Sequence, residues 1–408
     1  MNFAGFWESF LYVNYLGAGP LTWLGYGAGT FLGHEKMRLL DKPRPVLNPP
    51  PRVSLLIPAK DEEQRIRACI QSALDQDYPN LEVIAIDDRS IDRTGAILDE
   101  MATADSRLSV IHIHEGTLGP GWTGKNNALF TGTGRATGEW LLFVDSDVIL
   151  QPAAVTRTVT VSAYKKYDLL SLLPTLEAHT LWESMLIPLC SGAAATMYLI
   201  GLSNSDKMKK IAFGNGQFML ARRTAYDAIG GHEVVKDRFC EDTEMARLMK
   251  ERGLRTRVSW GSDFAAVRMY SSLAGIIKGW SRIYYAAKVG NPKHVVLAIW
   301  FLLSNCFTAY AAIIYGIFRA MHPHHNMLDS AWLGAGIAHW IVMTFILSCI
   351  YRWSKHSPWH ALLFPIAGPL LLWVLIKALI LCITKKVEWR GTSYSHKMAQ
   401  DLAIKSSV

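Results

Sequence analysis

The sequence has few charged residues for its length, and the motifs of several common sites are missing. Asp, Glu, Lys and Arg make up 19% of the 408 residues, whereas 50% are hydrophobic. This composition excludes a disordered chain, because the chain has enough apolar surface to bury. The six cysteines form no CxxC pair, so we expect free thiols and neither a zinc site nor a disulfide framework. No GxGxxG follows the first predicted strand and GxxxxGK[S/T] is absent, which argues against a Rossmann dinucleotide site and a P-loop.

The long apolar runs and the positive charge together indicate a membrane protein. Lys and Arg outnumber Asp and Glu by 42 to 34, which gives a net charge of +8. These cations cluster beside apolar segments, a pattern of membrane topology and not of a nucleic-acid partner. Each predicted span is near the ~20 residues that a helix needs to cross a bilayer. The four predicted spans are Tyr12–Gly33, Val295–Phe318, Ala331–Tyr351 and Trp359–Thr384.

The charges that follow the first apolar run predict the topology. Lys36, Arg38, Lys42 and Arg44 follow it, so the positive-inside rule predicts that the middle of the chain is cytoplasmic. We therefore expect a multi-pass protein of a bacterial inner membrane. The last run contains prolines that weaken a helix, so it is either spanning or re-entrant.

The region between the apolar runs alternates predicted strands and helices. Short apolar runs at Val53–Ile57, Leu81–Ile86, Leu108–Ile113 and Trp140–Val144 alternate with helical patterns. This alternation predicts a doubly wound α/β domain built on a parallel sheet with helices on both faces.

Carboxylates follow three of these predicted strands. The first strand ends in Pro58-Ala59-Lys60-Asp61-Glu62, the second in Asp87-Asp88-Arg89-Ser90, and the fourth in Asp145-Ser146-Asp147. Ligands of such sheets bind beyond the carboxyl ends of the strands, so we expect these side chains to share one site.

With these motifs in order, the region from about Val53 to Tyr285 resembles the inverting nucleotide-sugar glycosyltransferases of family 2, which have the GT-A fold. The resemblance implies a Rossmann-like GT-A domain, which we place at 51–290. The apolar runs and the charges beside them predict a transmembrane anchor and linker at 1–50, and transmembrane helices with a basic tail at 291–408. The further matching motifs are Gly121-Trp122-Thr123-Gly124-Lys125 and Glu241-Asp242.

The resemblance implies a UDP-sugar donor and a divalent cation, Mg²⁺ or Mn²⁺. Asp145 and Asp147 would bind ribose and metal, with Asp147 preferred as the metal ligand, because hard cations take carboxylate oxygens. Asp87 or Asp88 would accept a hydrogen bond from uracil, and the sequence does not decide between them. The other donor-side residues implied are Pro58, Ala59, Glu62 and Lys125.

The resemblance also implies the catalytic base. An inverting transfer needs a carboxylate to deprotonate the acceptor hydroxyl. Asp242 of the acidic pair is the preferred base and Glu241 the alternative, although an Asp at this place also suits a helix cap.

The acceptor side is the least determined part of the site. Gly216 and Gln217 lie in a glycine-rich stretch that the family places near the acceptor. The QxxRW motif of polysaccharide synthases is absent, and Trp280 and Arg282 stand in its place. Trp389 and Arg390 match a tail of enzymes that use lipid acceptors, or serve as an interfacial anchor. The apolar segment Leu181–Leu202 is a core helix or, as we prefer, an amphipathic segment on the bilayer.

Together these features predict a membrane-bound hexosyltransferase that moves a sugar from a UDP-sugar to a lipid hydroxyl at the cytoplasmic face. The resemblance is to ceramide glucosyltransferases and to hopanoid- or carotenoid-associated enzymes. The alternatives are a processive polysaccharide synthase and a non-catalytic membrane protein with a degenerate transferase domain.

Overall fold

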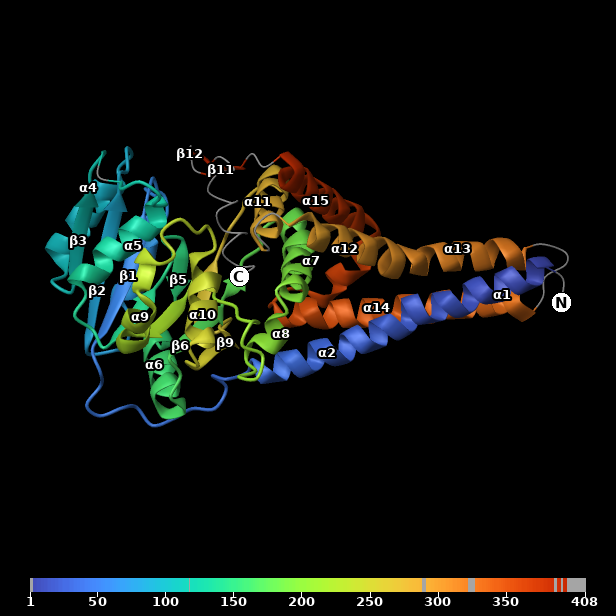
Figure 1. Cartoon of the computed structure of the whole chain (residues 1–408), viewed down its shortest axis with the longest axis horizontal. Coiled ribbons are helices and arrows are strands. Elements are labelled where there is room, and N and C mark those ends of the chain that lie inside the picture. Colours follow the sequence, from blue (N-terminus) through green and yellow to red (C-terminus); the bar gives the residue numbers. More distant parts are fainter. Residues whose placement is uncertain are drawn as a thin grey trace. The chain divides into compact units, whose positions relative to one another are not determined.

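The computed structural model describes residues 3–116, 118–287, 291–321, 327–384, 387–389 and 392–394. Contacts divide these residues into two units (Figure 1). The α/β unit comprises 34–177 and 198–269, and the helical unit comprises 3–33, 178–197 and the described residues from 270 onward. Compared with the predicted division at 51–290, the residues 178–197 and 270–287 belong with the helices.

A seven-stranded sheet in the order β3-β2-β1-β4-β8-β6-β9 forms the centre of the α/β unit. β1, β2, β3 and β4 are parallel as predicted, but β8 pairs antiparallel with both β4 and β6. The sheet is therefore mixed: the four strands predicted to be parallel are parallel, and β8, which was not predicted as a strand of the sheet, is antiparallel. The strands are β1 (Val53–Ala59), β2 (Leu81–Asp88), β3 (Leu108–Ile113), β4 (Trp140–Phe143), β6 (Leu169–Leu173), β8 (Met219–Arg222) and β9 (Thr256–Trp260).

Alternate side chains of the strands enter two separate apolar cores, one on each face of the sheet. Leu55 of β1 belongs to the core under α3, α4 and α6, whereas Leu56 belongs to the core under α5, α9 and α10. Strands buried on both faces read as continuous apolar runs, which explains why they were predictable. The covering helices are α3 (Ile66–Leu74), α4 (Thr94–Ala104), α5 (Gly124–Arg135), α6 (Ala154–Lys165), α9 (Arg223–Ile229) and α10 (Glu241–Glu251).

A second, three-stranded sheet begins directly after Asp147. It has the order β5-β10-β7, formed by Val148–Leu150, Ala265–Val267 and Thr175–Leu176. The short elements α8 (Ile200–Ser203) and η2 (Gly231–Glu233) complete this unit.

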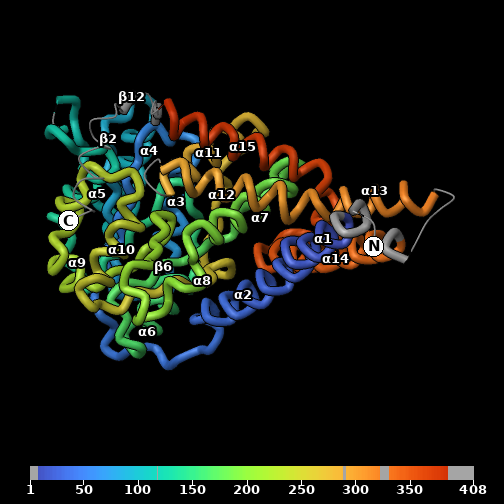
Figure 2. The backbone as a smooth tube through the Cα atoms, turned by 45° about the vertical axis from the view of Figure 1, so that its right-hand side comes forward, coloured from blue at the N-terminus to red at the C-terminus, as the bar shows by residue number. Residues whose placement is uncertain are grey.

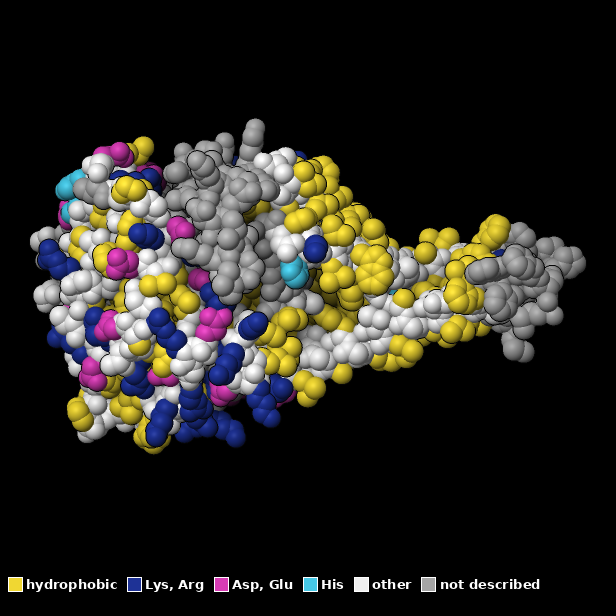
Figure 3. All heavy atoms as spheres, viewed as in Figure 1, with side chains coloured by type: hydrophobic (Ala, Val, Ile, Leu, Met, Phe, Trp, Pro, Cys, Tyr) yellow, Lys and Arg dark blue, Asp and Glu magenta, His cyan; other side chains and the backbone are white. Residues whose placement is uncertain are grey.

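Among its described residues, the helical unit contains three helical segments that are long and apolar enough to cross a membrane. They are Pro292–Ala320, Ser330–Trp353 and Pro358–Thr384, and they match three of the four predicted spans. Large apolar side chains such as Ile314 and Phe345 remain 68% and 60% exposed, as expected for a surface that faces lipid. Figure 3 shows these apolar side chains gathered over the helices, while Lys and Arg gather over the α/β unit.

The C-terminal run forms continuous helices despite its prolines. It begins with the 3₁₀ turn η4 (Pro358–Leu363) and continues as α15 (Phe364–Thr384), with Pro369 inside the helix. The other helices of this unit are α7 (Leu181–Met197), α11 (Leu273–Ala286), α12 (Pro292–Leu302), η3 (Leu303–Phe307), α13 (Thr308–Ala320) and α14 (Met327–Trp353). A short hairpin follows, β11 (Val387–Trp389) with β12 (Thr392–Tyr394).

The N-terminal segment is helical throughout, as α1 (Phe3–Leu16), η1 (Gly17–Leu21) and α2 (Thr22–Lys36). It is nevertheless not among the helices apolar enough to span by composition, and its many glycines give a physical reason. Figures 1 and 2 both show α1 beside α13 and α14. Buried hydrogen bonds join the segments: Trp23 Nε1 donates to the Asn305 carbonyl (2.6 Å), and His339 Nε2 lies 2.9 Å from the same oxygen.

The structure differs from both alternatives for Leu181–Leu202. The segment splits into α7 in the helical unit and α8 in the α/β unit. α7 packs against α11, α14 and α15, with its middle residues buried. Tyr351 Oη donates to the Met185 carbonyl (2.5 Å) and Tyr284 Oη to the Cys190 carbonyl (2.8 Å). α7 is therefore a packed helix of the helical unit, neither part of the α/β core nor a free amphipathic segment.

Candidate functional site

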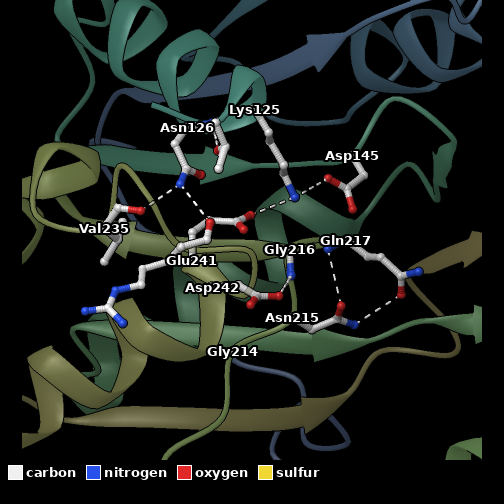
Figure 4. A network of polar contacts seen from close by, with 12 residues as sticks. Lys125, Asn126, Asp145, Gly214, Asn215, Gly216, Gln217, Val235, Glu241 and Asp242 are labelled. Carbon is white, nitrogen blue, oxygen red and sulfur yellow. Dashed lines mark hydrogen bonds and ion pairs between the residues drawn. The ribbon is translucent and has the colours of Figure 1, made fainter. Parts of the chain in front are cut away.

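A pocket opens at the carboxyl ends of β1 and β4, where the sequence predicted one. Its wall brings together residues from five separate segments of the chain. Figure 4 shows the polar ones among them, Lys125, Asp145, Gly216 and Glu241. The residues that line it are Pro58, Lys125, Leu129, Phe143, Val144, Asp145, Gly216, Met219 and Glu241. Five of these, Pro58, Lys125, Asp145, Gly216 and Glu241, were predicted site residues.

Lys125 is the cation at the centre of this pocket. Its Nζ lies 2.8 Å from Asp145 Oδ1 and 2.8 Å from Glu241 Oε1. Burial alone would lower the pKa of Lys125, but Asp145 and Glu241 more than offset this and hold the pKa well above its usual value. Lys125 therefore stays charged and links the loop after β4 to the start of α10.

Asp242 lies beside this ion-pair network and is held by two backbone N–H groups. Gly216 N donates to Asp242 Oδ2 (2.7 Å) and Thr243 N donates to Oδ1 (2.6 Å). Burial and the nearby Glu241 carboxylate raise the pKa of Asp242 to about 7, although Lys125 and the two N–H groups act in the opposite direction. The N-cap of α10 is Cys240, so Asp242 does not occupy the capping position that the sequence offered as its alternative role.

The glycine-rich loop approaches α10 so closely that Gly214 and Gly216 have no room for a side chain. A Cβ on Gly214 would lie 2.3 Å from the Asp242 carbonyl oxygen, and one on Gly216 would lie 2.7 Å from Lys125 Nζ. Asn215 stiffens the same loop, because its Nδ2 donates to the Leu172 carbonyl (3.0 Å) and to Gln217 Oε1 (3.2 Å). The loop thus delivers the Gly216 N–H group to Asp242.

Asp147 lies on the side of the site that faces the second sheet. Burial, followed by the negative charges of Asp145 and Glu62, raises the pKa of Asp147 to about 6. Its ion-pair partner is Arg65, at 3.5 Å, whose side chain is 44% exposed. Several carboxylates thus lie close together here, with Arg65 paired to Asp147 and Lys125 paired to Asp145.

The two candidate uracil acceptors have different partners. Both oxygens of Asp88 accept hydrogen bonds from the Arg89 guanidinium, at 2.8 and 2.9 Å. Asp87 Oδ2 lies 3.0 Å from His112 Nδ1, and His112 Nε2 lies 2.9 Å from Asp99 Oδ1. Hydrogen bonds to Asp99 and Asp87 raise the pKa of His112.

The remaining predicted site residues are distributed over several elements of the chain. Ala59 and Glu62 are buried at and after the end of β1, and Glu62 N donates to Thr94 Oγ1 (2.8 Å). Trp280 and Arg282 lie on α11 in the helical unit, whereas the residues that line the pocket belong to the α/β unit. Trp389 belongs to β11, without a described side chain, and Arg390 lies outside the described residues.

Sequence reasoning missed Arg65, His112 and Asn126. His112 lies near the carboxyl end of a predicted strand, so the rule that found Asp87 would also have found His112. Arg65 follows a cluster of charged residues that reads as a solvated helix start, and Asn126 reads as an ordinary residue of the first turn of α5.

With Asp242 as the base, as the resemblance implies, replacing Lys125 by Met should shift the acid limb of the pH profile of kcat/KM, the fall in rate toward low pH, to higher pH. The Lys125 charge lowers the pKa of Asp242, so its loss raises that pKa, and the carboxylate form then requires a higher pH. Lys209→Met, at an exposed lysine of the same unit, is the matched control and should leave the limb in place. An unmoved limb in the Lys125 variant would show that Lys125 does not tune Asp242.

Comparison with known proteins agrees with this geometry. The family model described as "Glycosyl transferase family 2" matches residues 54–229. A 4,4'-diaponeurosporenoate glycosyltransferase of Staphylococcus haemolyticus is 24% identical over 272 residues, which cover 65% of this chain and 70% of that protein. The enzyme of the same name from Staphylococcus aureus is 25% identical over 254 residues, which cover 60% of this chain and 64% of that protein.

Solved glycosyltransferase structures are also similar. The mannosyltransferase PcManGT from Pyrobaculum calidifontis, in complex with GDP-Man and Mn²⁺, has a TM-score of 0.49 and 17% identity, and the match covers 91% of this chain and all (100%) of that chain. S. aureus TarS 1-349 in complex with UDP-GlcNAc has a TM-score of 0.37 and 14% identity, covering 85% of this chain and 96% of that chain. The family match and the α/β sheet topology together confirm the predicted family, fold class and enzyme class: residues 54–229 form a family 2 glycosyltransferase domain of the GT-A type.

Proposed function

We propose that this protein transfers a sugar from a UDP-sugar to a hydroxyl group of a lipid, with inversion, at the cytoplasmic face of a membrane. The observation that carries the proposal is the convergence of Asp145, Glu241 and Asp242 around Lys125 at the carboxyl ends of the strands. An inverting transfer needs one carboxylate as base, and Asp242 is available for that role. The diphosphate needs positive charge, for which Lys125 and a cation held by carboxylates are the candidates.

In this proposal Asp242 is the general base. Its carboxylate removes the proton of the acceptor hydroxyl as that oxygen bonds to the anomeric carbon. The bond from that carbon to the diphosphate oxygen breaks, and its electron pair leaves with UDP. A pKa near 7 suits this task, because the group is partly ionised at neutral pH and still basic enough to take a proton.

The residues around Asp147 fit a divalent cation. The described residues contain no cluster of three or more His, Cys, Asp or Glu side chains that holds a metal by itself. Mg²⁺ commonly binds through one or two carboxylates together with substrate phosphates, and Asp145 and Asp147 provide two. Burial is the main cause of the raised pKa of Asp147 and the charge of Asp145 is the next, and a cation would relieve the repulsion between the two carboxylates. When bound, the cation would stabilise the negative charge that develops on the UDP leaving group.

The lipid acceptor is supported by the apolar helices and by the names of the relatives. In the part of the chain that the structure describes, three helical segments are long and apolar enough to span a bilayer. The relatives are named as glycosyltransferases of 4,4'-diaponeurosporenoate, a name that denotes a carboxylate. A lipid carboxylate is therefore the second candidate acceptor, and it would need no general base. Hydroxylamine cleaves the resulting glycosyl ester but not the glycoside of a hydroxyl.

The test of the function is an incubation of membranes that contain the protein with several labelled UDP-sugars and Mg²⁺ or Mn²⁺, followed by lipid extraction. We expect label in a single small lipid product, and this product should disappear when the metal is chelated. Label in a polymer that elutes early in gel filtration would instead indicate a polysaccharide synthase. Absence of both transfer and UDP-sugar hydrolysis would support a degenerate, non-catalytic domain.

A cysteine at position 106 should be labelled in intact cells only by a membrane-permeant reagent. Ser106 is exposed in the α/β unit, whose cytoplasmic placement was predicted from the cations after residue 35. The parent protein is the control, because Cys240 and Cys349 are partly accessible and set the background. Labelling of Ser106→Cys by an impermeant reagent would reverse the proposed topology and remove access to cytosolic UDP-sugar.

A further inference from the structure

Asn126 makes an unusual set of contacts next to the catalytic pocket. It is the third residue of α5 and its side chain is fully buried, at 0% exposure. Its Nδ2 donates to the backbone carbonyls of Val235 (2.7 Å), Lys236 (3.2 Å) and Arg238 (3.0 Å). Since three carbonyls surround this nitrogen, it must be the amide donor and not the oxygen. Figure 4 shows the amide pointing away from Lys125 and toward this loop.

The segment that Asn126 holds leads directly into the catalytic pair. Residues 235–240 precede Glu241, the first residue of α10. Cys240, the N-cap residue, makes no side-chain capping hydrogen bond, so the helix start lacks the usual local anchor. The backbone N–H of Thr123 donates to the Lys236 carbonyl (2.8 Å) and adds a second tie from the same end of α5.

Two neighbouring residues of α5 thus hold α10 in two ways. Successive side chains of a helix point in different directions, so Lys125 reaches into the pocket and pairs with Glu241, whereas Asn126 reaches the loop behind it. Asp242 lies one residue beyond Glu241 and receives the Gly216 N–H group at 2.7 Å. A shift of the loop would move both carboxylates relative to Asp145.

We propose that Asn126 is a positioning residue: by binding the backbone carbonyls of the 235–238 loop, it fixes the start of α10 and hence the place of Asp242 in the pocket. This inference rests on the proposed function, in which Asp242 is the base. Asn126 contacts no reacting group. We therefore expect its effect to fall mainly on the rate of transfer, because Asp242 follows the loop that Asn126 holds, whereas Asp87, Asp145 and Asp147 of the predicted donor side lie at strand ends.

The test compares Asn126→Asp with Asn127→Asp in the full-length protein. The first variant replaces the amide donor by an acceptor of the same shape opposite three carbonyls. The second adds the same charge one residue further, at a half-buried side chain for which the described structure shows no bond to this loop. Three quantities are measured: kcat, the KM for the UDP-sugar, and amide hydrogen exchange of the peptide spanning 235–242.

We expect kcat of Asn126→Asp to fall by about 10²-fold, the cost of a displacement on the order of 1 Å in a catalytic group. Donor KM should stay within about twofold, and exchange in 235–242 should become faster, whereas Asn127→Asp should resemble the wild type. Asn126→Ser, which keeps one shorter donor, should be intermediate in kcat and in exchange.

Unchanged kcat, or a raised KM with unchanged kcat, would overturn the proposal. Lower kcat with unchanged exchange would also overturn it, because the effect would not pass through the loop. If both Asn126 variants fail to fold while Asn127→Asp folds, Asn126 is a core residue and nothing more. Failure of the proposed function is distinguishable, because it would appear as absent transfer in the wild type or as full activity in Asp242→Asn, while the exchange measurement needs no activity.

Discussion

Replacing Asp242 by Asn is expected to lower transfer to the acceptor by about 10²–10⁴-fold, the usual contribution of a general base. The amide has the same shape, and its single oxygen can keep the bond from Gly216 N (2.7 Å) while the bond from Thr243 N (2.6 Å) is lost. The amide cannot take a proton from the acceptor. Melting temperature and UDP binding should change little, because the N-cap position of α10 belongs to Cys240 and not to Asp242. The comparison uses kcat per folded molecule, together with a thermal melt.

The pH dependence of kcat/KM is a second test of the role of Asp242. The pKa of Asp242 is raised to about 7 by burial and by Glu241, so wild-type kcat/KM should fall as the pH drops below about 7. This acid limb should be lost from the residual activity of the Asn variant. Glu244→Gln is the matched control on the same helix turn, since Glu244 pairs with Arg247 (2.6 Å) and not with the pocket. Normal transfer by Asp242→Asn would exclude it as base, and Glu241→Gln would then be the variant to measure.

The sequence predicted the strands of the parallel half of the sheet but not its antiparallel strand. β1 and β2 are apolar runs buried on both faces, and such runs are readable from composition alone. β8 has the same character, but its direction depends on which neighbours it meets, β4 and β6, and sequence pattern does not encode that choice. The sequence pattern likewise does not decide to which unit α7 belongs, because an apolar helix fits a protein core and a membrane bundle equally well.

The site was predictable where a topological rule applies. Asp87 and Asp145 follow strands, and the carboxyl ends of parallel strands meet at one edge. The ion pair between Lys125 and Glu241 joins segments far apart in the sequence, and only the folded chain reveals it. The same holds for the amide of Asn126, whose partners are backbone carbonyls with no sequence signature.

Replacing Asp147 by Asn should reduce transfer by at least about 10²-fold, because a bound cation supplies several kcal/mol of charge stabilisation in the transition state. The fold should not suffer. Burial and the charges of Asp145 and Glu62 raise the pKa of Asp147 to about 6, so its ionised form is disfavoured in the folded protein. The protonated form of Asp147 therefore contributes to the stability of the fold at low pH. This contribution is lost as the pH rises from the ordinary pKa of an Asp side chain through about 6, and at neutral pH the charged carboxylate destabilises the folded protein.

The neutral amide of the Asp147→Asn variant removes this destabilisation. The variant loses the partly exposed ion pair with Arg65 (3.5 Å), and such a pair contributes little to stability. The metal-free variant should thus melt at or above the wild-type temperature at pH 7.5. Adding Mn²⁺ with UDP should raise the melting temperature of the wild type but not of the variant, since a ligand stabilises only the protein that binds it. Asp227→Asn, at an exposed aspartate of α9, should behave as wild type in every measurement. A variant that transfers normally after metal removal, or that still shows the Mn²⁺-dependent shift, would mean that Asp147 is not a metal ligand and that the cation, if the enzyme uses one, is held by Asp145 and the donor alone.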